Sequence, residues 1–191
     1  MSKIIIHGGF FSESSTNIET KIAKQQALLR IVKDSYAYLQ NHSALETVVY
    51  AVSQLEDDEL FNAGIGSQIQ SDGKIRMSAS LMDGESQKMS GVINIEEVKN
   101  PIQVAQVLMQ VDDRILGGSG ATNFARKHGF ESFSTEIPQR RAEYEAKLAS
   151  LGTGTVGCVA LDKNGKIAVA TSTGGKGFEI PGRISDSATV A

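Results

Sequence analysis

The apolar residues near the amino terminus first form a short continuous run and then recur at helical spacing. Residues 3–6 contain three consecutive isoleucines, and from about residue 17 to residue 40 apolar side chains return every three or four positions. We therefore expect a strand over residues 3–6, followed by a helix whose apolar stripe covers a sheet. The residues of this predicted stripe are Ile22, Leu29, Val32, Tyr36 and Leu39.

Helical and strand-like patterns alternate through the middle of the chain. Closely spaced glycines in residues 61–66 mark irregular backbone between them. Pro101 suits the first position of a helix, where its missing N–H costs nothing, and Gly129 suits a helix end. The further elements predicted here are a helix over 44–55, strands over 74–82 and 91–98, a helix that begins at Pro101, and a helix over 121–127.

The last part of the chain changes character twice. Residues from about 132 to 154 are charged on nearly every helical face and end in Ser-Leu-Gly-Thr-Gly, so they are predicted to be a linker. Residues 155–161 and 166–173 are mostly apolar, and the Asn164-Gly165 pair between them predicts a hairpin. Strands that are apolar on both faces need cover on both sides. The pattern therefore predicts helical layers that sandwich sheets.

Composition and charge exclude several classes of protein. The chain has 191 residues and 40% hydrophobic content, enough for one buried core. Its 19 basic and 22 acidic residues are scattered, so no basic stripe predicts nucleic acid as a partner. The apolar run at the start is too short for a signal peptide and no later run approaches a membrane span, which predicts a cytoplasmic protein without a membrane partner. The single Cys158 excludes an intrachain disulfide, and the three histidines lack metal-ligand spacing.

Thr155 has two interpretations. A β-branched residue after a loop glycine is an ordinary way to begin a strand. Alternatively, Thr155 is a latent nucleophile, because a threonine hydroxyl becomes reactive when a base sits beside it, and a free terminal amine on the same residue is such a base. Only cleavage after Gly154 would create that amine. Glycine tolerates backbone conformations that hold a bond under strain, which suits the bond that is to be cut.

Two downstream clusters bear on this choice. Thr173 ends the second predicted hairpin strand, so an antiparallel pairing would bring it beside Thr155. The alternative is that residues 171–175 are simply a glycine-rich loop that closes a strand. Arg183 and Asp186 lie three positions apart, and together they fit the carboxylate and ammonium of an α-amino acid. The alternative for this pair is an ordinary surface ion pair.

Taken together, these segments closely resemble the plant-type L-asparaginase and isoaspartyl-peptidase family. The resemblance extends upstream in family order, and the segments that carry it are His7-Gly8-Gly9, 61–67, 79–84, 98–101, 154–162, 170–175 and 181–187. It implies an α+β fold, the four-layer αββα sandwich of the N-terminal-nucleophile hydrolases. It also implies a precursor that cuts itself into an α subunit, residues 1–154 with the linker at its end, and a β subunit that begins at Thr155.

Roles for individual residues follow from the resemblance. Thr155 is expected to be the nucleophile, Thr173 the second threonine that tunes it, and Asn62 the asparagine near it. Arg183 and Asp186 are expected to hold the α-carboxylate and α-amino group of the substrate. No cofactor is implied for catalysis, but a structural sodium ion is, held by the backbone carbonyls of Leu55, Glu56, Asp58, Phe61, Ala63 and Ile65. A turn held by its own hydrogen bonds is the alternative for that loop.

The implied activity is hydrolysis of L-asparagine or β-aspartyl dipeptides to aspartate through a β-aspartyl-enzyme on Thr155. The resemblance further implies a homodimer of αβ units. Because the family continues beyond the position of Ala191, residues 1–191 are expected to be part of a single truncated domain that lacks the carboxyl-terminal part of the β subunit and its oxyanion hole. Two alternatives are a glycosylasparaginase-like hydrolase and a non-catalytic relative that acts as a binding partner.

Overall fold

The computed structural model describes residues 1–9, 18–146 and 155–188. None of the helices within these ranges is both long and apolar enough to cross a membrane. The elements, in chain order, are β1 (Lys3–His7), α1 (Ile18–Leu39), α2 (Ala44–Glu56), β2 (Met77–Asp83), β3 (Lys88–Ile95), α3 (Pro101–Leu108), β4 (Ile115–Gly117), α4 (Gly118–Lys127), α5 (Pro138–Ala146), β5 (Val156–Leu161), β6 (Ile167–Thr173) and the 3₁₀ helix η1 (Asp186–Ala188).

The described strands form one six-stranded sheet in the order β1-β5-β6-β2-β3-β4. Every neighbouring pair is antiparallel except β3 and β4, which are parallel. The predicted β5–β6 hairpin is confirmed: Leu161 pairs with Ile167, and Gly165 turns the chain at a φ of 80°. The Asp162 carboxylate accepts hydrogen bonds from the backbone N–H groups of Asn164 and Lys166 and so holds the turn. The segment that begins the proposed β subunit therefore lies inside the sheet and pairs with β1 and β6.

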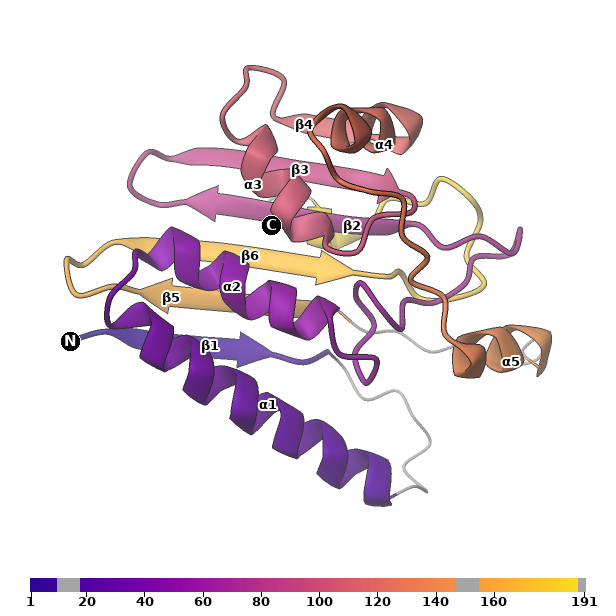
Figure 1. Ribbon diagram of the computed structural model, residues 1–191, viewed down its shortest axis with the longest axis horizontal. Coiled ribbons are helices and arrows are strands. Elements are labelled where there is room, and N and C mark those ends of the chain that lie inside the picture. Colours follow the sequence, from indigo (N-terminus) through magenta and orange to yellow (C-terminus); the bar gives the residue numbers. More distant parts are fainter. Residues whose placement is uncertain (10–17, 147–154, 189–191) are drawn as a thin grey trace.

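Helices cover one face of this sheet (Figure 1). α2 packs on β5 and β6, α3 packs on β2 and β3, and α1 packs on α2 and β1. The helices and the inward-facing strand residues, among them Val156, Cys158 and Ala170, form one buried core. Burial raises the pKa of the Cys158 thiol to about 12, which agrees with a packed apolar residue rather than a reactive one.

The opposite face of the sheet carries an apolar row. Paired residues in register across five strands give this outer row, which consists of Ile5, Val159, Val169, Met82 and Met89. Ile5, Val159 and Met82 are exposed, with 71%, 43% and 39% of their surface open. The described residues thus form a mixed α/β architecture of two layers, one six-stranded sheet and the helices that cover one of its faces. The second sheet of the expected sandwich is not among its elements.

The structure corrects the predicted stripe of α1. Of the five predicted residues only Leu39 is buried, while Leu29 is 54% exposed. The helix instead buries Ala27, Ile31 and Ser35. These residues are spaced by four, and two of them are small, so this face lets α1 approach α2 and β1 closely. Ile22, Leu29 and Tyr36 lie on the other side of the helix and are exposed.

Part of the predicted linker is helical, because residues 138–146 form helix α5, and part of this helix is anchored. Arg140, in its first turn, is 9% exposed, and its Nε donates to the carbonyl of Gly66 over 2.7 Å. Glu143 accepts from the same guanidinium at 2.8 Å. This highly charged segment therefore packs on the rest of the protein, because Arg140 is buried against the carbonyl of Gly66. Residues 147–154 lie outside the described residues.

Candidate active site

Thr155 directly precedes β5, and the strand register brings Thr173 beside it. Val156 pairs with Ser172, so the residues just beyond that pair, Thr155 and Thr173, face each other at the end of the hairpin. Their hydroxyl oxygens are 3.5 Å apart, a long contact in which Thr155 is the donor. The hydroxyl of Ser187 donates to Thr155 Oγ1 over 3.1 Å. Gly154, the other side of the predicted cleavage point, lies outside the described residues.

Thr173 is held in place by the glycine turn that follows it. It is 2% exposed, and its hydroxyl oxygen accepts from the N–H of Gly175 at 3.1 Å. Gly175 has a φ of 80°, which disfavours any side chain. A Cβ at Gly174 would lie 2.4 Å from Cβ of Ser67 and 2.6 Å from the side-chain oxygen of Asn62. The turn is therefore glycine-rich because the 61–68 loop packs directly against its backbone.

Asn62, which the family resemblance places near the nucleophile, contacts this turn. Its backbone carbonyl accepts from the N–H of Gly174 at 2.9 Å, and its side-chain nitrogen donates to the carbonyl of Gly175. Its side-chain oxygen accepts from the N–H of Gln68 at 3.0 Å, which fixes the amide orientation. Asn62, Thr173 and Thr155 are thus linked through one continuous set of contacts, although residues 62 and 155 are distant in the sequence.

Arg183 is oriented by a buried carboxylate that the sequence analysis missed. Glu179 is 4% exposed, and its carboxylate lies 3.1 Å from Nη1 of Arg183. The same carboxylate accepts from the side chain of Gln70 at 3.0 Å and from the N–H of Lys176 at 2.9 Å. The spacing of four residues between Glu179 and Arg183 was the available signal. The Arg183 side chain keeps 37% exposure, so part of its guanidinium can still receive a ligand carboxylate.

Asp186 is the first residue of η1 and is exposed. The hydroxyl of the next residue, Ser187, donates a hydrogen bond to Thr155, the candidate nucleophile. Asp186 is therefore brought to the end of the β5–β6 hairpin. The structure thus places Thr155, Thr173, Asn62 and Asp186 around one end of that hairpin. Arg183 connects to it through Glu179, which lies against Gly175.

Helix α5 contacts the two loops that carry these residues. On one side the carbonyl of Thr135, just before α5, accepts from the N–H of Gly66, whose own carbonyl accepts from Arg140. On the other side Tyr144 stacks on Phe178 with ring centroids 5.2 Å apart. Phe178 lies between Gly175 and Arg183 and has a φ of 54°, which is uncommon for a residue with a side chain. The end of the proposed α subunit thus holds both loops in position.

The loop predicted to hold sodium is a carbonyl-rich turn. Among the described residues, two of the six predicted carbonyls accept backbone hydrogen bonds outside the helices and strands: that of Glu56 from Ile65 at 2.7 Å, and that of Asp58 from Phe61 at 3.1 Å. At Gly66 a Cβ would lie 2.6 Å from the carbonyl oxygen of Glu59 and 2.9 Å from that of Phe61. Oxygens therefore converge on this loop. No cluster of His, Cys, Asp and Glu side chains in the described ranges is arranged to hold a metal ion.

Glu56 is a fully buried carboxyl directly behind the candidate site. Its Oε1 accepts from the N–H of Ile102 in the first turn of α3 at 3.1 Å, whereas its Oε2 lacks a hydrogen-bond partner among the described residues. Burial raises the pKa of Glu56 to about 8, and the nearby Ser172 hydroxyl lowers it only in part, without reaching hydrogen-bond geometry. The carboxyl is thus mostly protonated at neutral pH.

The raised pKa of Glu56 predicts a pH-dependent stability. The carboxyl ionises at about 4.5 in the unfolded chain and at about 8 in the folded protein. The folded state therefore binds the extra proton between these values, and the free energy of unfolding should fall as pH rises through them, by up to about 1.4 kcal/mol per pH unit. Above the folded pKa this dependence should end. Denaturant unfolding at several pH values between about 5 and 9 measures it.

Glu56→Gln is the matched test of that slope, because the amide is of similar size and does not titrate. Glu56→Gln should flatten the pH dependence of the free energy of unfolding between the two pKa values. Glu19→Gln, a replacement at an exposed position, should leave that dependence unchanged. An unchanged slope in Glu56→Gln would assign the pH dependence to other groups.

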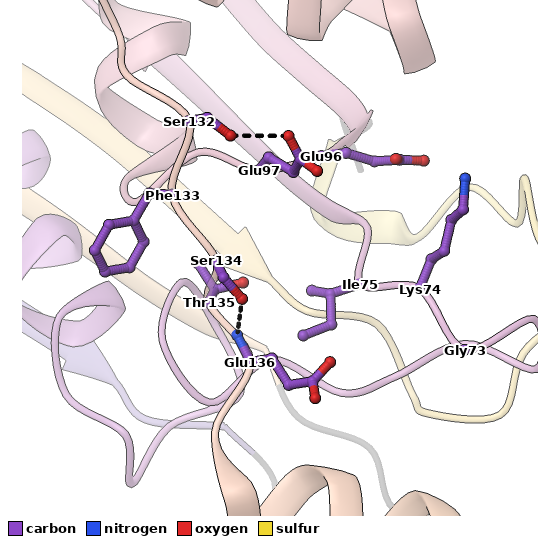
Figure 2. Close-up of a pocket in the computed structure, with 10 residues that line it drawn as sticks. All are labelled: Gly73, Lys74, Ile75, Glu96, Glu97, Ser132, Phe133, Ser134, Thr135 and Glu136. Atoms are coloured by element: carbon purple, nitrogen blue, oxygen red, sulfur yellow. Dashed lines mark hydrogen bonds between the residues drawn. The ribbon is translucent and has the colours of Figure 1, made fainter.

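The cavity in Figure 2, of about 290 Å³, lies apart from this arrangement. Residues 73–75, 96–97 and 132–136 line it, and none of the predicted site residues is among them. Its three acidic side chains are already engaged, Glu96 with Arg76, Glu97 with Arg126 and Glu136 with Arg141. The cavity therefore offers no unpaired carboxylate to a ligand, and the candidate active site remains the end of the β5–β6 hairpin.

Comparisons with known proteins identify the family of the chain. The family model described as "Asparaginase" matches residues 1–148 and 134–191. An isoaspartyl peptidase/L-asparaginase of Synechocystis sp. is 44% identical over 99% of this chain and 63% of its own length. A relative of the same name from Nostoc sp. is 44% identical over 99% of this chain and 66% of its own length. A plant-type L-asparaginase of Pyrobaculum calidifontis is 36% identical over 98% of this chain and 67% of its own length.

The chain thus spans about two thirds of the length of the curated relatives it matches. The two segments that match the family model together cover residues 1–191, so the residues of the candidate site lie within them. The chain belongs to the asparaginase family that includes the isoaspartyl peptidases and plant-type L-asparaginases.

Proposed function

We propose that the protein is a self-cleaving amidohydrolase that uses Thr155 to hydrolyse L-asparagine and β-aspartyl peptides to L-aspartate. The observation that carries this proposal is the position of the Thr155 hydroxyl, which lies directly before strand β5 and between the hydroxyls of Thr173 and Ser187. A residue that merely begins a strand does not need two hydroxyl partners. The names of the relatives support the same reaction class.

Self-cleavage would come first. The Thr155 hydroxyl attacks the carbonyl carbon of Gly154, its proton passes to the leaving amide nitrogen, and the peptide bond becomes an ester on Oγ1. Water then hydrolyses the ester, which leaves a carboxylate on Gly154 and a free α-amino group on Thr155. With a pKa of about 7.7–8.0, that amine is partly unprotonated at neutral pH and can act as the base for its own hydroxyl.

Substrate hydrolysis would use the same oxygen. The amine takes the proton of the Thr155 hydroxyl, and the oxygen attacks the side-chain carbonyl of asparagine or of a β-aspartyl peptide. The ammonia or amine that leaves takes the proton from the Thr155 ammonium, and water releases aspartate from the ester. Arg183, oriented by Glu179, would bind the α-carboxylate, and Asp186 would bind the α-ammonium group.

The apolar outer row of the sheet supports the full sandwich architecture. Ile5, Val159 and Met82 would be covered by a second sheet contributed by the remaining part of the β subunit, since exposed apolar rows of this length are uncommon on a finished surface. In that architecture residues 1–191 belong to one domain. Residues 1–154 are the α subunit and residues 155–191 begin the β subunit. We further propose that two αβ units form a homodimer, as the family resemblance implies.

The carbonyl-rich loop is consistent with a bound sodium ion. The oxygens of Glu59 and Phe61 already converge beside Gly66, and hard oxygen ligands suit such an ion. The carbonyls of Leu55, Glu56, Asp58, Ala63 and Ile65 would complete the site together with Phe61. The ion would fix the shape of the loop that carries Asn62 and would take no part in the reaction itself.

The test of the proposed function is mass spectrometry of the purified full-length protein together with an aspartate-release assay. The expected result is a fragment that begins at Thr155, and release of aspartate from both asparagine and β-aspartyl dipeptides. A glycosylated asparagine hydrolysed in preference to both would favour a glycosylasparaginase. A chain that stays intact and releases no aspartate would overturn the proposal and support a non-catalytic binding partner.

A further inference from the structure

Ser187 approaches the candidate nucleophile more closely than any of the other described side chains that contact its hydroxyl. Ser187 Oγ lies 3.1 Å from Thr155 Oγ1 and is the donor, whereas Thr173 Oγ1 lies 3.5 Å away. Ser187 is 5% exposed, so its hydroxyl is shielded from water by the surrounding residues. A buried hydroxyl directed at a reactive oxygen is strengthened by the low local dielectric.

The backbone of Ser187 is fastened to the sheet, which fixes where its side chain can reach. Its carbonyl accepts from the hydroxyls of Ser80 on β2 and Thr171 on β6, at 2.8 Å and 2.5 Å. Ser80 and Thr171 are paired in register, and their own oxygens are 2.9 Å apart. η1 is therefore anchored on the outer face of the sheet, beside the end of the β5–β6 hairpin, by the hydroxyls of Ser80 and Thr171.

We propose that Ser187 is a further catalytic residue that donates a hydrogen bond to the nucleophilic oxygen of Thr155. This inference rests on the proposed function of Thr155. The Ser187 hydrogen bond occupies one lone pair of Thr155 Oγ1, and the Thr155 proton points toward Thr173, so the other lone pair is left for attack. As that oxygen loses its proton, negative charge develops on it and the Ser187 donor stabilises it. No proton leaves Ser187 in the reaction.

The chain contains a matched control two residues away. Ser185 is also a buried serine, at 6% exposure, but its hydroxyl has no hydrogen-bond partner among the described residues. Ser185→Ala and Ser187→Ala remove the same atom from neighbouring positions of one loop. Only the second variant removes a donor from Thr155. A difference between them therefore reports the hydrogen bond and not the loss of a buried hydroxyl in this loop.

The experiment measures self-cleavage and steady-state hydrolysis of asparagine in the full-length protein. We expect Ser187→Ala to slow self-cleavage and to lower kcat by about tenfold or more, with KM little changed, since the lost interaction acts on the attacking oxygen and not on the substrate. Ser185→Ala should behave as the unmodified protein in both assays. Ser187→Thr, which keeps the hydroxyl, should restore most of the rate.

Each outcome decides between the two proposals. Equal rates for Ser187→Ala and Ser185→Ala in a protein that cuts itself before Thr155 would overturn the role of Ser187 and leave the proposed function standing. A full-length protein that never cuts itself would overturn both. If Ser187→Ala does not fold, Ser187→Cys, which keeps the size but is a weak donor, should show the same slowing. Wild-type rates in Ser187→Cys would then contradict the role of Ser187.

Discussion

Replacing Thr155 with alanine is expected to leave the full-length chain uncut and to abolish aspartate release. The variant keeps the strand, because Val156 and the residues after it make the β5 pairings. It removes the single oxygen that lies between the hydroxyls of Thr173 and Ser187. Both rounds of the proposed chemistry use that oxygen, so no partial activity should remain. Intact-mass spectrometry after prolonged incubation, with an aspartate assay on the same sample, measures both losses.

Thr155→Ser is the matched control for this result. Serine keeps the hydroxyl and loses only the methyl group, so the variant should still cut itself, at a lower rate because the oxygen is held less firmly. Thermal unfolding should show little difference between the two variants. A chain that is still cut before residue 155 in Thr155→Ala would assign cleavage to another group or to a contaminating protease, and would remove the main support for the nucleophile.

The second large effect is expected from Gly174→Ala. The added methyl carbon would lie 2.4 Å from Cβ and Oγ of Ser67 and 2.6 Å from the side-chain oxygen of Asn62, well inside van der Waals contact. Because Cβ of Ser67 is fixed to its backbone, the 61–68 loop must move. We expect a loss of roughly 1–3 kcal/mol in the free energy of unfolding. A shift of about 1 Å in Asn62 is expected to reduce kcat by about 10²-fold.

Gly120→Ala provides the control for Gly174→Ala. A Cβ at Gly120, in α4, would meet no atom within 4 Å, and alanine favours a helix over glycine. That variant should be at least as stable as the unmodified protein and fully active. Denaturant unfolding and steady-state kinetics on both variants separate the outcomes. Wild-type stability and activity in Gly174→Ala would show that the 61–68 loop does not pack against the Thr173–Gly175 turn as described.

Much of the local structure was predictable because it depends on residues close in the sequence. The capping box of Ser43 and Glu46 at the start of α2, Pro101 at the start of α3 and the turn at Asn164-Gly165 all act over a few positions. The pairing of Thr155 with Thr173 was predictable for the same reason, because a short hairpin fixes its own register. The family resemblance supplied Asn62, Arg183 and Asp186, which such local rules alone leave undecided.

The errors arose where burial depends on a distant partner. α1 carries two possible apolar stripes, and only the packing of Ala27, Ile31 and Ser35 against α2 and β1 decided which one faces inward. The frequent charges of residues 132–154 gave no sign of helix α5, in which Arg140 reaches the carbonyl of Gly66. The partner of Arg140 is 74 positions away in the sequence, so the pattern of residues around Arg140 does not reveal it.

By itself, the sequence determined the hairpin, its two threonines, the starts of α2 and α3, and the family. Those features follow from local propensity and from motifs. The tertiary structure alone decided that Glu179 is buried against Arg183, that Glu56 is buried behind Ser172 with a raised pKa, and that Ser187 donates to Thr155. Each of these depends on strands and loops that meet only after folding, because a hydrogen bond or a desolvated carboxyl is a property of the surroundings and not of the residue type.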